Sequence, residues 1–144
     1  MNKKEYGELY RLALEARERA YTPYSGYNVG AALLAKSGKI YLGANIENAA
    51  YGDTVCAERV AIFKAVYDGE REFQAIAIAG AKAGETPSVP CPPCGSCRQV
   101  MAEFSDGSLD IVLGGDTGIE VHRLDEILPM SFIKSALSGE EENV

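Results

Sequence analysis

The four cysteines of this chain are its strongest candidates for a metal-binding or reactive site. Cys91, Cys94 and Cys97 fall within one seven-residue segment, and Cys56 precedes them. Cysteines separated by two residues usually bind a metal ion or carry out redox chemistry. An unreactive buried thiol is the alternative for any one cysteine, but it does not account for three in so short a segment. The spacing therefore predicts a metal or redox site.

Glu58 lies two residues after Cys56 and is a candidate for proton transfer. If three thiolates bind zinc and water takes the fourth position, a nearby carboxylate can accept a proton from that water and donate it elsewhere. The alternative role for Glu58 is an interaction with the helix dipole. The only histidine is His122, so a zinc site built on histidines is nearly excluded. We expect His122 to be structural or solvent-facing.

Two predicted helices, about residues 53–67 and 95–104, carry these groups near their N-termini. Helix N-termini lower the pKa of a thiol, and the i, i+3 spacing puts Cys94 and Cys97 on one helix face. Helices that follow neighbouring strands begin at a common edge of the sheet. We therefore expect Cys56 to meet the other two thiols there.

The chain as a whole predicts an α/β fold with three α/β/α layers and a mixed five-stranded sheet in one domain, residues 1–136. A first helix is expected over 4–21, and the strands over 27–35, 39–45, 73–79, 109–113 and 119–122. The middle β-α-β unit should be a right-handed parallel crossover. The final strand pair should be antiparallel because its connection is too short for a parallel crossover. Residues 137–144 are expected to be an acidic, disordered tail.

Charge and hydropathy exclude several classes of protein. The 144 residues carry a formal charge of −7, which disfavours general binding to nucleic acid or anionic membranes. No apolar run reaches 18 residues and no secretory signal is visible, so we expect a cytoplasmic protein. Stable disulfides are rare in a reducing compartment, which leaves two structural disulfides as a weak alternative for the cysteines.

Several blocks of sequence, taken in order, resemble the short-chain homotetrameric cytidine deaminases, the zinc-dependent type with three cysteine ligands. The blocks are Tyr21–Ser25, Val29–Leu33, Gly43–Tyr51, Cys56–Arg59, Pro93–Val100, Leu128–Pro129 and Phe132. Zinc deaminases share a metal ligand, one residue and a glutamate, followed later by P-C-x-x-C. The resemblance implies a cytidine-deaminase-like fold and one Zn²⁺ per subunit.

The resemblance also implies roles for individual residues. Those expected around the metal are the ligands Cys56, Cys94 and Cys97, the proton shuttle Glu58, and Arg59 and Gln99 beyond them. Those expected to bind substrate are Tyr27, Asn45, Glu47, Ala57 and Phe132, the last in a neighbouring subunit's pocket, with Tyr51 near the same contact.

Elementary chemistry supports two of these assignments. Three thiolates and Zn²⁺ carry a net negative charge, which hydrogen bonds from Arg59 could offset; a solvated surface arginine is the alternative. Asn45 and Glu47 alternate at a strand end and suit a sugar diol, whereas a carboxylate repels phosphate. The pair favours a nucleoside over a nucleotide, and the alternative is a loop-structuring asparagine with a solvated glutamate.

Cys91 departs from the family pattern. A thioredoxin-type C-x-x-C and an iron–sulfur cluster with Cys56 as a further ligand are both possible from spacing alone. Against the first, such motifs follow an early strand, and Glu58 would be unexplained. Against the second, Pro92 and Pro93 favour an extended path that carries Cys91 away from the helix start. We predict that Cys91 is not a metal ligand.

The expected activity is hydrolytic deamination of cytidine and 2′-deoxycytidine to the uridines in pyrimidine salvage, by a homotetramer with shared active sites. The partner is a small nucleoside, with no nucleic acid and no membrane. The alternatives are a deaminase of a modified cytosine nucleoside such as blasticidin S, a polynucleotide-editing deaminase, and a non-catalytic zinc or redox module.

Overall fold

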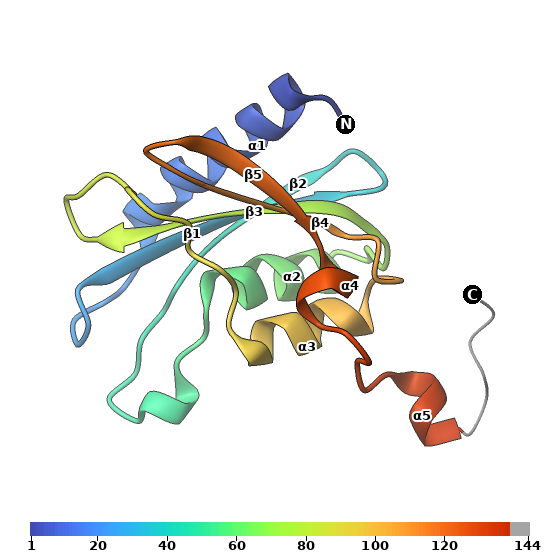
Figure 1. The fold of residues 1–144 in the computed structure, drawn as a ribbon. Coiled ribbons are helices and arrows are strands. Elements are labelled where there is room, and N and C mark those ends of the chain that lie inside the picture. Colours follow the sequence, from blue (N-terminus) through green and yellow to red (C-terminus); the bar gives the residue numbers. More distant parts are fainter. Residues whose placement is uncertain (139–144) are drawn as a thin grey trace.

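Five strands form one sheet in the order β2-β1-β3-β4-β5 (Figure 1). The computed structural model describes residues 1–138, with the strands β1 (Tyr27–Ala35), β2 (Ile40–Ala44), β3 (Phe73–Lys82), β4 (Asp110–Gly115) and β5 (Gly118–Arg123). β3 and β4 pair in parallel, and every other neighbouring pair is antiparallel. The predicted α/β fold with a mixed sheet and an antiparallel final pair is confirmed.

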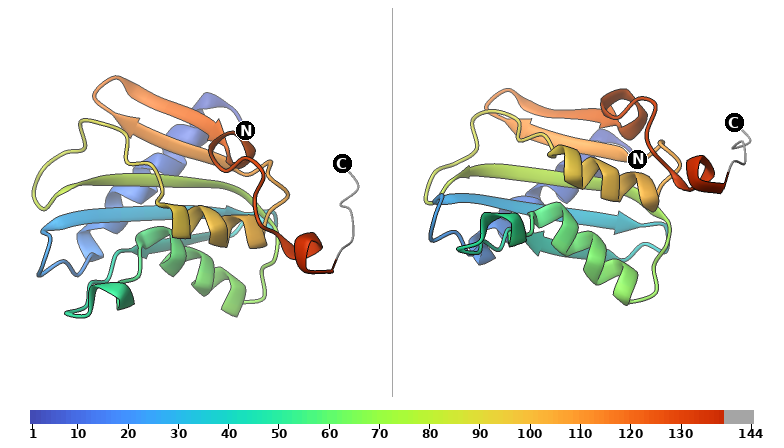
Figure 2. Two further views of the ribbon diagram at one scale, coloured as in Figure 1. Left: turned by 60° about the horizontal axis from the view of Figure 1, so that its bottom comes forward. Right: turned by 90° about the horizontal axis from the view of Figure 1, so that it is seen from below.

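Helices cover both faces of this sheet. α1 (Lys3–Ala16) packs on one face, while α2 (Ala57–Tyr67) and α3 (Gly95–Glu103) lie side by side on the other (Figure 2). Side chains of β3 alternate between the two layers: Ile76 and Ile78 join the core beneath α2 and α3, and the alanines between them face α1. The larger side chains therefore lie on the face that carries both cysteine-bearing helices.

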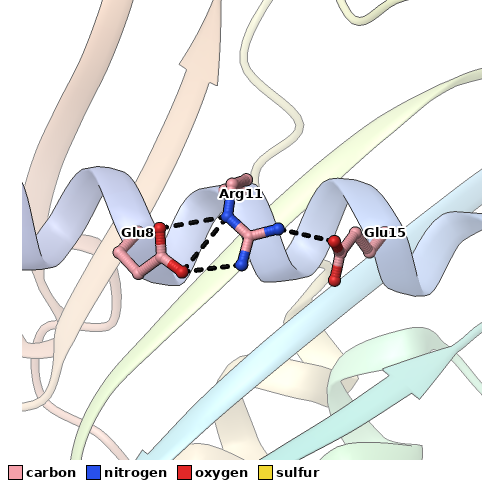
Figure 3. Close-up of polar contacts among 3 residues, drawn as sticks. All are labelled: Glu8, Arg11 and Glu15. Carbon is pink, nitrogen blue, oxygen red and sulfur yellow. Dashed lines mark hydrogen bonds and ion pairs between the residues drawn. The ribbon is translucent and has the colours of Figure 1, made fainter.

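α1 turns its charged side chains away from the sheet. Arg11 bridges two carboxylates on this face, with Nη2 2.6 Å from Glu8 Oε1 and Nη1 2.5 Å from Glu15 Oε1 (Figure 3). Exposed i, i+3 and i, i+4 pairs of this kind stabilise a helix by only about 0.2–0.5 kcal/mol each. The opposite side of α1 buries Leu9 and Ala13. Burial on the sheet, more than surface charge, sets the position of α1.

α1 ends earlier than predicted, at Ala16, and the 3-10 turn η1 (Arg17–Arg19) follows it. The reason is a backbone pairing made further along the chain. Tyr21 N donates to Asn45 O at 2.9 Å, and Glu47 N donates to Tyr21 O at 2.9 Å. A helix continued to residue 21 would leave the Tyr21 amide committed to its own turn.

α2 begins later than predicted, at Ala57, because residues 51–55 have other partners. Tyr51–Asp53 form the 3-10 turn η2, and Val55 and Ile46 exchange two backbone hydrogen bonds of 3.0 Å. Cys56 is thereby left as the residue that caps α2.

Two single helical turns that the sequence did not predict follow the sheet, α4 (Leu124–Ile127) and α5 (Lys134–Ser138). Leu137 and Ser138 of the expected tail belong to α5, and residues 139–144 lie outside the described part of the chain. Within residues 1–138, no helix has the length and apolar character needed to cross a membrane.

Candidate functional site

Three of the four cysteines meet where α2 and α3 begin. Cys56 caps α2, Cys94 caps α3, and Cys97 lies in the first turn of α3. The Sγ atoms of Cys56 and Cys94 are 3.9 Å apart, those of Cys94 and Cys97 are 3.4 Å apart, and all three lie within 4.8 Å of one another. Three thiols at two helix N-termini fit one Zn²⁺, with a fourth position left for water.

Arg59 brings positive charge to this cluster. Its Nη2 lies 3.4 Å from Cys56 Sγ and 3.4 Å from the Thr54 carbonyl oxygen. The hydrogen bond with Cys97, together with Arg59, lowers the pKa of Cys56 to about 5, while the same hydrogen bond raises the pKa of Cys97. The hydrogen bonds and the Arg59 guanidinium thus favour a thiolate in the cluster, the form in which cysteine binds a metal cation.

Glu58 is buried beside the thiols, in the first turn of α2, with 4% of its surface exposed. Burial raises the pKa of its carboxyl group, and the nearby Cys56 adds to this effect. A carboxyl group with a raised pKa can hold a proton and release it, as a general acid–base catalyst must. Glu58 therefore lies beside the three thiols with its carboxyl group buried, and its role as a proton shuttle stays a prediction.

Asn45 and Glu47 lie together on the chain that follows β2; Asn45 binds the start of β1, and Glu47 binds the segment that leads into it. Asn45 accepts from Val29 N and donates to Tyr27 O, each at 2.9 Å. Glu47 Oε1 accepts from the backbone amides of Tyr24 and Ser25 at 3.0 Å. The two side chains therefore hold the residues around Tyr27 in place, whatever else they bind.

Glu47 is almost completely buried, with 7% of its surface exposed. The hydroxyl of Ser25 donates to Glu47 Oε2 and lowers the pKa of this carboxyl group, so it is charged at neutral pH. A carboxylate offers about four acceptor positions, and three are occupied by donors from residues 24 and 25. Acceptor capacity remains on Glu47 for a further hydroxyl group.

Cys91 lies outside the three-thiol cluster, as predicted, and packs against Tyr27. A Cβ atom on Gly80 would stand 2.7 Å from Cys91 Sγ and 3.1 Å from Tyr27 Cε1, so the glycine makes room for both side chains. Burial and the neighbouring Cys91 thiol raise the pKa of Tyr27 to about 12. Cys91 thus contacts Tyr27, an expected substrate-binding residue. The spacing of the cysteines in the sequence did not indicate this contact.

The remaining predicted residues have varied surroundings. Ala57 is fully buried at the start of α2, between Cys56 and Glu58. Phe132 is 60% exposed, and its carbonyl oxygen accepts from Gln99 Nε2 at 2.6 Å. Gln99 therefore binds the C-terminal segment rather than a cysteine.

Two aromatic or titratable residues lie away from the thiols. Tyr51 stacks edge-on against Tyr24, with ring centroids 5.8 Å apart. His122 lies on β5 with Nε2 3.3 Å from Glu120 Oε2, and it belongs to no group of metal-binding side chains within residues 1–138.

Arg17 is a buried positioning residue that the sequence analysis missed. Its Nε donates to Asn28 O at 2.9 Å and its Nη2 to Ala81 O at 3.1 Å, which ties β1 to β3 next to Tyr27. The sequence could have indicated this burial, because Arg17 falls on the same side of the predicted first helix as the apolar residues Ala13 and Ala16.

Comparison with known proteins agrees with this geometry. Residues 3–113 match the family model of the cytidine and deoxycytidylate deaminase zinc-binding region. A cytidine deaminase of Sporosarcina psychrophila is 52% identical over 125 residues, which cover 86% of this chain and 88% of that protein. One of Halalkalibacterium halodurans is 49% identical over 86% of this chain and 91% of its own.

The fold is shared with solved structures at substantial identity. The crystal structure of cytidine deaminase from Burkholderia pseudomallei has a TM-score of 0.80 and 43% identity, covering 92% of this chain and all of that one. That of Mycobacterium tuberculosis has a TM-score of 0.76 and 34% identity, covering 89% of this chain and 97% of its own. On sequence and fold together, the chain belongs to the family of zinc-binding cytidine and deoxycytidylate deaminases.

Proposed function

We propose that this chain hydrolyses cytidine and 2′-deoxycytidine to uridine and 2′-deoxyuridine, with release of ammonia. The observation that carries the proposal is the buried carboxyl group of Glu58 beside three sulfur atoms within 4.8 Å of one another. A metal-binding cluster alone would suit a structural site, whereas an adjacent buried acid is what hydrolysis requires. Relatives named cytidine deaminases support the cytosine nucleoside as substrate.

Each residue of the site has a part in the reaction. Cys56, Cys94 and Cys97 would hold a zinc ion, which when bound would supply the Lewis acidity that lowers the pKa of the attacking water. Glu58 accepts one proton of that water and delivers it to N3 of the ring, while the water oxygen forms a bond to C4. Glu58 then carries the second proton to the amino group as the C4–N bond breaks, and ammonia leaves. Arg59 offsets the charge of the thiolates.

Asn45 and Glu47 bind the sugar in this proposal. The charged, buried carboxylate of Glu47 retains acceptor capacity for a ribose hydroxyl, and it would repel a 5′-phosphate brought close to it. Because Asn45 and Glu47 also hold the backbone around Tyr27, the sugar-binding groups and this aromatic side chain form one rigid unit. This arrangement favours a nucleoside over a nucleotide.

The active enzyme is a homotetramer in which Phe132 of one subunit reaches the pocket of another. Phe132 is 60% exposed, Tyr67 is 96% exposed, and Phe63 and Ile46 are also exposed apolar side chains. Ile46, Phe63 and Tyr67 line one groove, and large apolar groups gathered on a surface mark a site of association. The reduced thiols suit a cytoplasmic enzyme, and a nucleoside substrate suits pyrimidine salvage.

A cytidine assay combined with zinc quantitation on the purified protein tests the activity. We expect about one zinc ion per chain, release of ammonia and uridine from cytidine, and slower turnover of blasticidin S. Zinc without turnover would indicate a non-catalytic zinc module. Faster turnover of blasticidin S would indicate the modified-nucleoside deaminase, and salt-sensitive binding of RNA or DNA would indicate a polynucleotide enzyme.

A further inference from the structure

Two consecutive residues of α3 hold the C-terminal segment of the same subunit. Arg98 and Gln99 directly follow Cys97 in the chain. Arg98 Nη1 donates to Ile127 O at 2.6 Å, and Gln99 Nε2 donates to Phe132 O at 2.6 Å. The helix that contributes two of the clustered thiols is thus also bonded to both ends of the segment 127–132.

This segment contains little regular structure of its own. It connects the single turns α4 and α5, and between them Met130 is fully exposed with φ of 50°, in the left-handed region that few non-glycine residues adopt. Leu128 and Ile133, which precede and follow Phe132 in the chain, are half-buried against the core, whereas the ring of Phe132 is exposed. The direction of that ring therefore depends on how the backbone of residue 132 is held.

Gln99 holds the backbone of the residue that carries this exposed ring. Its hydrogen bond reaches the carbonyl oxygen of Phe132 itself, while the ring makes the exposed surface. Arg98 fixes the start of the segment and also donates to Pro93 O at 2.8 Å, next to Cys94. Side-chain hydrogen bonds from α3 thereby connect the helix that carries Cys97 to the segment that carries the exposed ring.

We infer that Arg98 and Gln99 are positioning residues that set the direction in which Phe132 leaves the subunit and enters the neighbouring active site. The inference rests on the proposed function, in which the ring of Phe132 contacts the substrate of another subunit. Neither residue touches that substrate. Each acts through the backbone of the C-terminal segment, so their loss should weaken substrate binding more than it slows the chemical step.

Gln99 gives the sharper test, because Arg98 also donates a hydrogen bond to the carbonyl oxygen of Pro93, the residue before Cys94. Gln99→Met keeps the length of the side chain and removes the donor. In the zinc-loaded oligomer, we expect KM for cytidine to rise about 2- to 10-fold, the effect of losing one neutral hydrogen bond, with kcat nearly unchanged. Glu103→Met, an exposed position near the end of the same helix, is the matched control and should leave KM unchanged.

A double-mutant cycle with Phe132→Ala separates positioning from a general structural effect. If Gln99 acts through Phe132, Gln99→Met should raise KM no further in the Phe132→Ala background. Two outcomes would overturn the inference and leave the proposed function intact. In the first, the effects of the two substitutions on KM add. In the second, Phe132→Ala raises KM but Gln99→Met leaves KM at the wild-type value. A wild-type KM for Phe132→Ala would overturn both the inference and the shared site. Zinc content and sedimentation, measured on every variant, must match those of the wild type.

Discussion

At the scale of single residues, the site depends on a carboxyl group that is buried next to thiols. Glu58 is 4% exposed, and a buried carboxylate without compensation is costly. A role of Glu58 in proton transfer during a reaction accounts for the cost of burying its carboxyl group. A carboxylate that only interacted with the helix dipole could do so from a solvated position, without the cost of burial.

Glu58→Gln tests this role directly. The amide is nearly isosteric and cannot accept a proton, so zinc content should stay near one ion per chain while kcat for cytidine falls by about 10²–10⁴-fold. Steady-state kinetics and metal analysis on the same preparation measure both quantities. A variant with near-normal kcat is incompatible with the mechanism.

Cys91→Ser tests the choice of metal ligands. The hydroxyl is close in size to the thiol and can keep the polar contact with Tyr27, so we expect zinc content and kcat to stay within about twofold of the wild type. The matched variant Cys94→Ser, within the cluster, should lose most of the zinc. Loss of zinc from Cys91→Ser would mean that the ligand set is wrong.

At the scale of elements, close contact of α2 with the sheet fixes the position of the site. A Cβ atom on Gly43 would lie 2.3 Å from Ala57 O and 2.6 Å from Ala61 N. Only glycine allows the first turns of α2 to lie so close to β2. Because Cys56 and Glu58 belong to this end of α2, the packing of one glycine affects both metal and proton chemistry.

Gly43→Ala should therefore displace the start of α2. Overpacking costs about 1–3 kcal/mol, so we expect lower stability in urea unfolding at fixed protein concentration, together with lower zinc content and kcat. Gly7→Ala is the matched control: nothing lies within 4 Å of its added Cβ, and alanine inside α1 should stabilise by about 0.5–1 kcal/mol. Unchanged zinc content and kcat in Gly43→Ala would show that the position of α2 is not set by this contact.

At the scale of the whole molecule, the isolated chain leaves aromatic groups unburied. Phe63 and Tyr67 lie one turn apart on the outer face of α2, 48% and 96% exposed. They line a groove of about 450 Å³ together with apolar and polar side chains, namely Ile46, Val55, Val60, Glu47, Asn48, Asp53 and Lys64. Exposed aromatic groups beside this groove mark α2 as a candidate surface for the proposed assembly.

Phe63→Glu should weaken the proposed tetramer by placing a charge in this surface. We expect smaller species in sedimentation and a raised KM, with zinc still bound, because the three thiols belong to one chain. Gln74→Glu changes the net charge equally at an exposed position of β3 and should leave assembly intact. A wild-type chain that is monomeric and fully active would refute the shared site.

Local patterns in the sequence were sufficient for most of the fold and for the metal cluster. The apolar segment 73–79 predicts a strand, and the i, i+3 spacing of Cys94 and Cys97 predicts one helix face, because both signals come from residues close together in the sequence. The meeting of Cys56 with them followed from the order of strands and helices. These features depend on local spacing and on the order of the elements, both of which can be read from the sequence.

Tertiary structure decided the features that depend on pairing between distant segments. Tyr21 pairs with Asn45 and Glu47, and Val55 pairs with Ile46, so α1 ends and α2 begins where these backbone groups are committed elsewhere. The contact of Cys91 with Tyr27 and the bond from Gln99 to Phe132 arise in the same way. Helical propensity is a sum of weak local preferences, and a non-local hydrogen bond that must be satisfied in the folded chain overrides it.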